Sequence, residues 1–322
     1  MGTVPFIDLI DVLLAAGPVV VTGLGLTVTQ RVLGDSTPAP VLLARRVQPI
    51  GALAAVVSLT MPEGPGAGAL ATLWFAVCVC ATAGGGVVLV GRVASGEALA
   101  VELVRWPLAL VTLGVALGYL TVGGAWLVIS QLGLHPFDLS TDIVRLTAVH
   151  FHYAGFGMSL LAATGLASAD WMASRVSLSI GSVAAIVGPP LVAVGFVTDS
   201  GLAQVGGAVV VTVAAWAVAF GTFLLATSSS PARVAPSWER GLAQWGGRMR
   251  LVVSSLSPII PMLLAVQWAL AQHVDVPALG VRDMANTHGV VNGIGFVIAG
   301  LAGWLLAGVT SPETEPALAP AA

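Results

Sequence analysis

Long apolar runs alternate with short polar segments along almost the whole chain. A run of about 20 apolar residues is long enough for a helix to cross the hydrocarbon core of a bilayer. Nine runs reach roughly that length, at about 9–29, 41–61, 67–91, 107–130, 143–166, 177–197, 202–226, 251–271 and 285–308. The pattern therefore predicts an all-α, polytopic transmembrane helical bundle, with residues 1–308 as one domain and 309–322 as a disordered cytoplasmic tail.

Two longer segments separate these runs. The first, 93–106, contains Glu97, Glu102 and Arg105, and we interpret it as an interfacial helix that leads into the fourth span. Glu102 and Arg105 are three residues apart and are expected to pair on that helix, with a second functional site as the alternative. The second segment, 227–250, is rich in Ser, Pro and Arg and is predicted to be the longest loop.

The composition excludes several classes of protein. Hydrophobic residues make up 57% of the 322 residues and charged residues only 8%, whereas soluble domains carry about 25% charged residues. The net charge of −3 argues against nucleic acid as a partner. All twelve basic residues are Arg, which excludes a Schiff-base lysine and a phosphate-binding lysine. We expect a multi-pass protein of the cell membrane in which Cys78 and Cys80 are packing residues.

The distribution of arginines predicts the orientation. Cytoplasmic loops carry an excess of Arg, and ten of the twelve arginines fall in the odd-numbered segments between spans. Only Arg145 and Arg282 fall in the even-numbered ones. This places the N-terminus outside and the C-terminus inside. All five histidines then lie in outer loops or in the outer half of the membrane, His135 in a turn and His273 in an exposed loop.

The fifth span begins with the polar sequence "TDIVRLTAVHFHYAGFG". Asp142 and Arg145 are three residues apart and can pair as an interfacial anchor. His152 lies deeper on the same helical face, whereas His150 points roughly 200° away and shares a face with Thr147 and Tyr153. The two histidines are therefore expected to serve different purposes.

The ninth span contains a second polar motif, "RDMANTHGVVNGIGF". His288 and Asn292 are four residues apart and share one face. Gly289 and Gly293 form a small-xxx-small pair, as Gly155 and Ser159 do in the fifth span, and such pairs let membrane helices approach closely. We expect the two spans to pack against each other or a common partner, around a polar pocket in the outer half.

The segments "LTAVHFHYAGFG" and "NTHGVVNGIGF" resemble the signature segments of the YndJ-like family of membrane proteins. The resemblance covers a third to half of the chain. It implies a multi-pass bacterial membrane protein, and it implies no mechanism beyond a loose association with transport. The His-x-His pattern followed by Gly-Phe is also similar to haem-binding spans of nitric-oxide-related membrane proteins.

Ionisable groups inside a membrane favour a functional site. The main hypothesis is a membrane-embedded acid–base enzyme, a metal-independent cyclase or isomerase that acts on a lipophilic small molecule and requires no cofactor. Opening of an epoxide or cyclisation of a terpenoid chain would suit such a water-excluding site. The predicted catalytic residues are His150, His152, His288, Asp142 and Asp283. The predicted substrate-binding residues are Phe151, Tyr153, Phe156, Arg145, Arg282, Asn286 and Asn292.

Three other interpretations remain open from the sequence. The chain could be a proton-coupled transporter, although an odd number of spans does not divide into two equal inverted repeats. It could hold a haem or a metal between His288 and one of the histidines of the fifth span. In the structural interpretation, the histidines make only hydrogen bonds between helices and the charged pairs near the interface are anchors. Membrane lipid is an expected partner in every case.

Overall fold

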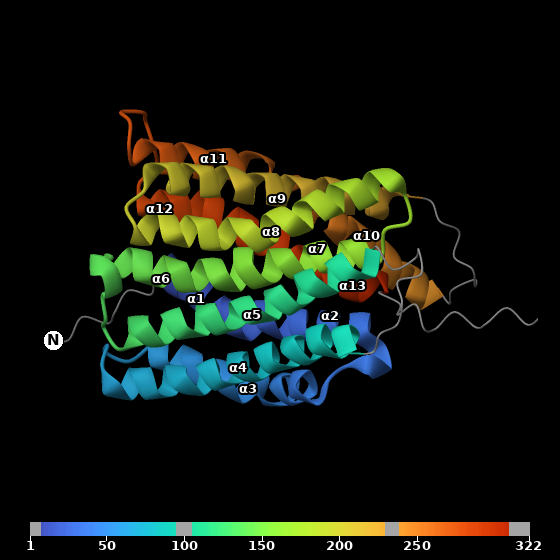
Figure 1. Cartoon of the computed structure of the whole chain (residues 1–322), viewed down its shortest axis with the longest axis horizontal. Coiled ribbons are helices and arrows are strands. Elements are labelled where there is room, and N and C mark those ends of the chain that lie inside the picture. Colours follow the sequence, from blue (N-terminus) through green and yellow to red (C-terminus); the bar gives the residue numbers. More distant parts are fainter. Residues whose placement is uncertain (1–7, 95–104, 229–237, 309–322) are drawn as a thin grey trace, which may run out of the picture.

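A computed structural model of the chain describes residues 8–94, 105–228 and 238–308. All regular elements in these ranges are helical, and they form one elongated bundle in which the long helices run back and forth along a common direction (Figure 1). The first half contains α1 (Leu9–Ala16), η1 (Gly17–Val21), α2 (Thr22–Leu33), η2 (Gly34–Ser36), α3 (Ala39–Leu59), α4 (Pro65–Ala94), α5 (Arg105–Gln131) and η4 (Pro136–Asp138). The remainder contains α6 (Thr141–His150), η5 (Phe151–Gly157), α7 (Met158–Ala167), α8 (Met172–Val197), α9 (Gly201–Thr227), α10 (Trp238–Leu256), α11 (Ile259–Ala271), α12 (Val281–Met284), η6 (Ala285–Gly289), η7 (Val291–Ile298) and α13 (Ala299–Ala307).

Eight stretches in the described ranges are long and apolar enough to cross a membrane. They coincide with eight of the nine predicted spans and confirm the all-α membrane-spanning class. The predicted fifth span corresponds to the continuous helix formed by α6, η5 and α7, which runs along the bundle beside the others (Figure 1). It falls outside the eight because its first half carries Asp142, Arg145, His150 and His152, which lower its hydropathy.

The structure corrects the predicted loop at 227–250. Helix α9 ends at Thr227, but α10 already begins at Trp238, so the second half of the predicted loop is helical. The first turns of α10 are amphipathic, with exposed Leu242 and Trp245 among polar residues, and a hydropathy average does not detect such a helix. The predicted interfacial segment 93–106 lies largely outside the described residues, as do Glu97, Glu102 and the tail 309–322.

Two consecutive prolines in α8 show how the helices beside the fifth span are fixed. Pro189 and Pro190 have no backbone N–H, so the carbonyls of Ala185 and Ile186, one turn earlier, lose their helical partners. Ser159 of α7 donates to the carbonyl of Ala185 at 3.5 Å, and Tyr119 of α5 donates to that of Ile186. Neighbouring hydroxyls thus satisfy both carbonyls, as is usual for proline in membrane helices, and they hold α8 against α5 and α7.

The two polar motifs lie at the same end of the bundle. The loop after α5, the start of α6, the loop after α11 and the start of α12 all meet there (Figure 1). His135 and His273 lie in the two loops, and the other three histidines lie in the helices that start there, His150 at the end of α6, His152 in η5 and His288 in η6. The prediction that the histidines share one half of the bundle is therefore consistent with the fold, and the assignment of this end to the outer face stays a prediction.

Candidate functional site

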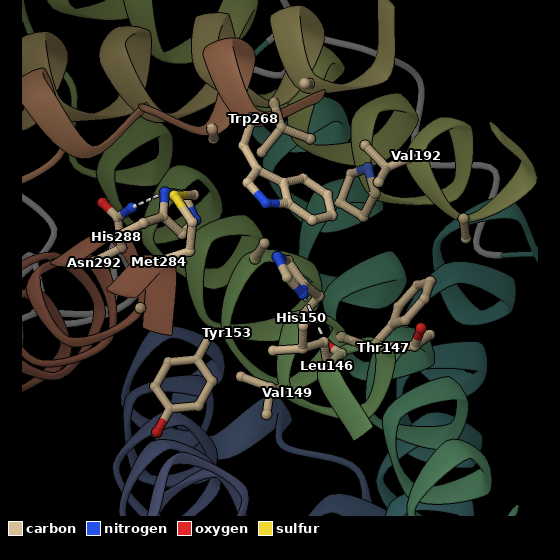
Figure 2. Close-up of a pocket in the computed structure, with 18 of the residues that line it drawn as sticks. Leu146, Thr147, Val149, His150, Tyr153, Val192, Trp268, Met284, His288 and Asn292 are labelled. Carbon is tan, nitrogen blue, oxygen red and sulfur yellow. Dashed lines mark hydrogen bonds between the residues drawn. The ribbon is translucent and has the colours of Figure 1, made fainter. Parts of the chain in front are cut away.

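A cavity of about 230 Å³ lies between the helix α6–η5–α7 and the later helices α8, α9, α11, α12, η6 and η7. Its walls are mainly aliphatic and aromatic side chains, and Figure 2 shows His150 reaching into it. The polar lining side chains, apart from the two tryptophans, are Thr147, His150, Tyr153, Gln204, His288 and Asn292. No carboxylate and no arginine is among the described residues that line it.

His150 is the last residue of α6, and its side chain is exposed because it borders the cavity. Its Nδ1 lies 2.7 Å from the carbonyl oxygen of Leu146, one turn earlier. A carbonyl only accepts, so Nδ1 carries the proton and Nε2 keeps its lone pair. Nε2 has no hydrogen-bond partner within the described ranges, so the acceptor atom of His150 is available to a ligand.

His288 lies in η6 and is fixed in the same way. Its Nδ1 lies 2.8 Å from the carbonyl oxygen of Pro261 in α11, which again makes Nδ1 the donor. The imidazole centroids of His150 and His288 are 6.5 Å apart, with their planes inclined by 29°. Figure 2 shows Asn292 on the side of His288 that faces away from His150. The two rings are therefore neighbours across the cavity, and neither Nε2 has a partner among the residues that the structure describes.

Asn292 has one polar atom that the protein leaves unsatisfied. Its Nδ2 lies 3.2 Å from Nδ1 of His288 and 3.4 Å from the sulfur of Met262, and its Oδ1 is buried without a hydrogen-bond partner in the described part of the chain. Because Nδ1 of His288 already donates to Pro261, the amide oxygen is the better atom to face it, and the amide orientation is then reversed. In either orientation, one end of the amide remains free to bind a ligand.

His152 lies outside the cavity. Only 1% of its side chain is exposed. Its Nδ1 donates to the carbonyl of Ala148 at 2.8 Å, and its Nε2 accepts from the indole N–H of Trp74 in α4 at 3.1 Å. Both ring nitrogens are satisfied, and Gly17 and Gly123 leave room for the ring because a Cβ atom on Gly123 would lie 2.7 Å from Nδ1. In this arrangement neither ring nitrogen of His152 is available to a ligand.

The charged residues predicted for the site do not line the cavity either. Asp142, Asp283 and Arg282 are exposed. Arg145 forms an ion pair with Asp11 of α1 instead of the predicted pair with Asp142, which has no ion-pair partner among the described residues. Sequence spacing identifies partners only within a helix, whereas α1 packs against α6 and brings Asp11 to Arg145.

The remaining predicted residues divide in the same way. Phe151 and Tyr153 line the cavity, and the hydroxyl of Tyr153 donates to the carbonyl of Leu13 at 3.1 Å. Phe156 is fully buried beside Gly25, and Asn286 is exposed. The cavity also contains residues that the sequence did not single out, among them Gln204, Met262, Trp268 and Met284. Gln204, Met262 and Trp268 come from α9 and α11, so no pattern within the motif spans identifies them, whereas Met284 lies one turn before His288 in the second motif and its spacing could have identified it.

The helices around the site contain four π-helical segments, namely η1, η5, η6 and η7. Segments η1, η5 and η7 pack against one another, and α1 packs against η6. The packing is close: a Cβ atom on Gly157 would lie 2.4 Å from Val297, and one on Gly293 would lie 3.0 Å from Tyr153. The two motif spans therefore pack together, as the sequence predicts. π-Helical turns are rare and occur frequently at functional sites.

Comparison with known families matches residues 12–296 to the model described as "YndJ-like protein". No curated protein and no solved structure matches the chain. Within the described ranges, no group of three or more His, Cys, Asp and Glu side chains is placed to hold a metal ion.

Proposed function

The chain belongs to the YndJ-like family, and we propose that it binds a compact, mainly apolar small molecule in the cavity between the two motif helices. One observation carries this proposal: two imidazoles, each with Nδ1 bound to a backbone carbonyl and Nε2 unpartnered, face a cavity whose other walls are largely apolar. A few convergent polar groups in an apolar pocket are the usual arrangement of a ligand site.

The dimensions limit the ligand. Drug-sized molecules occupy pockets of about 300–1,000 Å³, and this cavity holds about 230 Å³. A short isoprenoid or a molecule of similar volume fits that space, with its polar group between His150 and His288 and its apolar part against Phe151, Trp268 and neighbouring aliphatic residues.

The cyclase or isomerase predicted from the sequence stays a prediction, but the cavity changes its chemistry. Neither Asp142 nor Asp283 lines the cavity, so the proposed site includes neither carboxylic acid. Thr147, Tyr153 and Gln204 already donate to backbone carbonyls, so we assign polar recognition of the substrate mainly to His150, His288 and Asn292. Transport of the same molecule, and haem binding between the two histidines, also stay predictions.

Photolabelling tests whether the cavity binds ligands. The probe is a geranyl-type alcohol that carries a diazirine and an alkyne, added to the purified protein in detergent, and labelled peptides are identified by mass spectrometry. We expect labels in the peptides that contain Tyr153 and Trp268. Ala265 lines the cavity on α11, and Ala265→Trp should fill it and lower this labelling at least about tenfold.

The matched control is Ala83→Trp, at an exposed position on the outer face of α4. This variant adds the same tryptophan side chain at a position away from the cavity, and it should leave the labelling of the cavity peptides unchanged. Equal labelling of the cavity peptides in both variants would contradict the proposal, because the probe would then be reporting adsorption to the apolar surface.

A further inference from the structure

We infer that His150, His288 and Met284 form a binding site for a soft, monovalent metal ion, Cu(I). The inference rests on the proposed function, because the ion would lie at the polar end of the same cavity and present an open coordination position to the ligand. The main hypothesis from the sequence is a metal-independent site, and its alternative of a haem or metal between His288 and a histidine of the fifth span includes no methionine; the choice of His150 and the position of Met284 beside the cavity come from the folded chain.

The orientation of the two imidazoles is the first argument. A histidine that binds a metal almost always donates its other ring N–H to a carbonyl, a carboxylate or water, which fixes the ring and keeps the ligating nitrogen unprotonated. His150 and His288 both meet this condition through the carbonyls of Leu146 and Pro261. His152 does not, because Trp74 occupies its Nε2. The structure therefore distinguishes two potential ligands from a third histidine nearby.

The distance between the rings is the second argument. For an ion held in line between one nitrogen of each ring, two bonds of about 2.0–2.1 Å and the two distances from nitrogen to ring centre add up to roughly 6 Å, which is the largest separation of the centroids that permits binding. The centroids are 6.5 Å apart. The separation of the two rings is therefore close to the one that an ion held in line between them requires.

Thioether sulfur is the third argument. Met284 precedes His288 by one helical turn, and both side chains line the cavity (Figure 2). Met158 and Met262 also line it, so three of the seven methionines of the chain gather around one cavity. Imidazole and thioether together select copper, and thioether favours its reduced form.

Charge decides between a monovalent and a divalent ion. Burial of an uncompensated charge in an apolar environment is unfavourable, and the penalty grows with the charge. All cavity-lining residues that the structure describes are neutral or imidazole side chains, with no carboxylate or thiolate to balance a divalent cation. Cu(I) carries a single charge and accepts two or three neutral ligands, whereas the magnesium and calcium sites of proteins are built from oxygen ligands.

Competition with a chromogenic chelator tests the site. Purified protein is titrated with Cu(I) in the presence of bicinchoninate under anaerobic conditions, with no lipophilic probe present. We expect one Cu(I) per chain in the wild type and at least about tenfold weaker binding in His150→Ala, His288→Ala and Met284→Leu. The control is His135→Ala, which removes an exposed histidine outside the cavity and should bind Cu(I) like the wild type.

X-ray absorption of the copper-loaded wild type makes the test independent of how well the variants fold. We expect two nitrogen ligands and one sulfur ligand, with the sulfur lost in the near-isosteric Met284→Leu. The inference is overturned if the wild type takes up no more copper than the double variant His150→Ala/His288→Ala. So does a copper spectrum without sulfur, or a preference for Zn(II) over Cu(I).

The two proposals fail separately. If copper does not bind but the photoprobe still labels the cavity and Ala265→Trp blocks it, the metal site is refuted and the ligand pocket stands. If copper binds with the expected ligands but Ala265→Trp does not affect labelling, the proposed function is refuted together with the open coordination position for its ligand, and copper binding by the three side chains is all that remains.

Discussion

Replacement of His152 by alanine tests whether this residue holds the fold together or belongs to the functional site. Its ring fills a space between Gly17 and Gly123, and its Nε2 accepts the only hydrogen bond that the Trp74 indole makes among the described residues. His152→Ala leaves that indole N–H buried and unpaired, and it opens a small cavity. We therefore expect loss of stability, with the cavity between the motif helices left intact.

The structure allows the size of the effect to be estimated. Side-chain hydrogen bonds between membrane helices contribute about 0.6 kcal/mol on average and about 1.7 kcal/mol at most. The truncation removes a volume of roughly 60 Å³, and a residual cavity costs about 24 cal/mol per Å³, which gives about 1.4 kcal/mol. The two contributions predict a loss of about 2–3 kcal/mol in the free energy of unfolding. His150→Ala, which removes only a bond within its own helix, should cost less than about 0.5 kcal/mol.

Unfolding in mixed micelles of detergent and sodium dodecyl sulfate, followed by circular dichroism, measures these differences. A double-mutant cycle with Trp74→Phe isolates the interaction of the two side chains, and we expect a coupling free energy of about 0.6–1.7 kcal/mol. A coupling near zero, or a His152→Ala protein as stable as His150→Ala, would refute the structural role. If His152→Ala also lost the cavity labelling at full stability, the residue would belong to the site after all.

Two further predictions concern how the motif helices are held. Gly157→Ala should destabilise the protein by about 1–3 kcal/mol, because the new Cβ atom would lie 2.4 Å from the stiff, buried side chain of Val297. The control is Gly118→Ala, which has open space at its Cβ position and should be neutral or slightly stabilising in the same unfolding assay. Equal effects of the two substitutions would show that the close approach of Gly157 to Val297 is unimportant for stability. Arg145→Ala should cost about 1–3 kcal/mol through loss of the charged hydrogen bond to Asp11, and the exchange of both charges in Asp11→Arg/Arg145→Asp should recover at least half of it. No recovery would contradict a direct ion pair.

The class of fold was predictable because the bilayer imposes it. A helix that crosses a membrane needs a long apolar run whatever its neighbours are, so eight predicted spans agree with the structure without any knowledge of packing. The prediction of a loop at 227–250 is wrong for the same reason, because a long apolar run reveals only helices of high mean hydropathy and α10 begins with an amphipathic stretch. The polar fifth span was identified from its apolar second half, which follows Phe156.

The candidate site was predictable only in part. Periodicity within each helix correctly grouped His150 with Thr147 and Tyr153, and it correctly paired His288 with Asn292. It could not show which residues of other helices complete the cavity. It also could not show that a distant partner, Asp11, outcompetes a local one for Arg145.

The separation of His150 from His152 depends on the local backbone geometry. The ring of His150 faces the cavity, whereas Nε2 of His152 accepts a hydrogen bond from the indole of Trp74. The boundary between α6 and η5 falls between them, at Phe151. A regular α-helix already directs residues two apart to different faces, and the π-helical turns that follow shift every later side chain relative to that pattern.

The same shift occurs in the second motif, where His288 lies in η6 and Asn292 in η7. Both motifs place a histidine at or within a π-helical segment and follow it with closely packed glycines, Gly157 in one and Gly293 in the other. The glycines allow the wider backbone of one segment to lie against its neighbour, and the histidines then meet across the cavity that this packing leaves. On this argument the glycines of each motif serve to position its histidine, so a bulky residue at Gly157, which does not line the cavity and whose Cβ would meet Val297, should disturb copper binding and ligand labelling together.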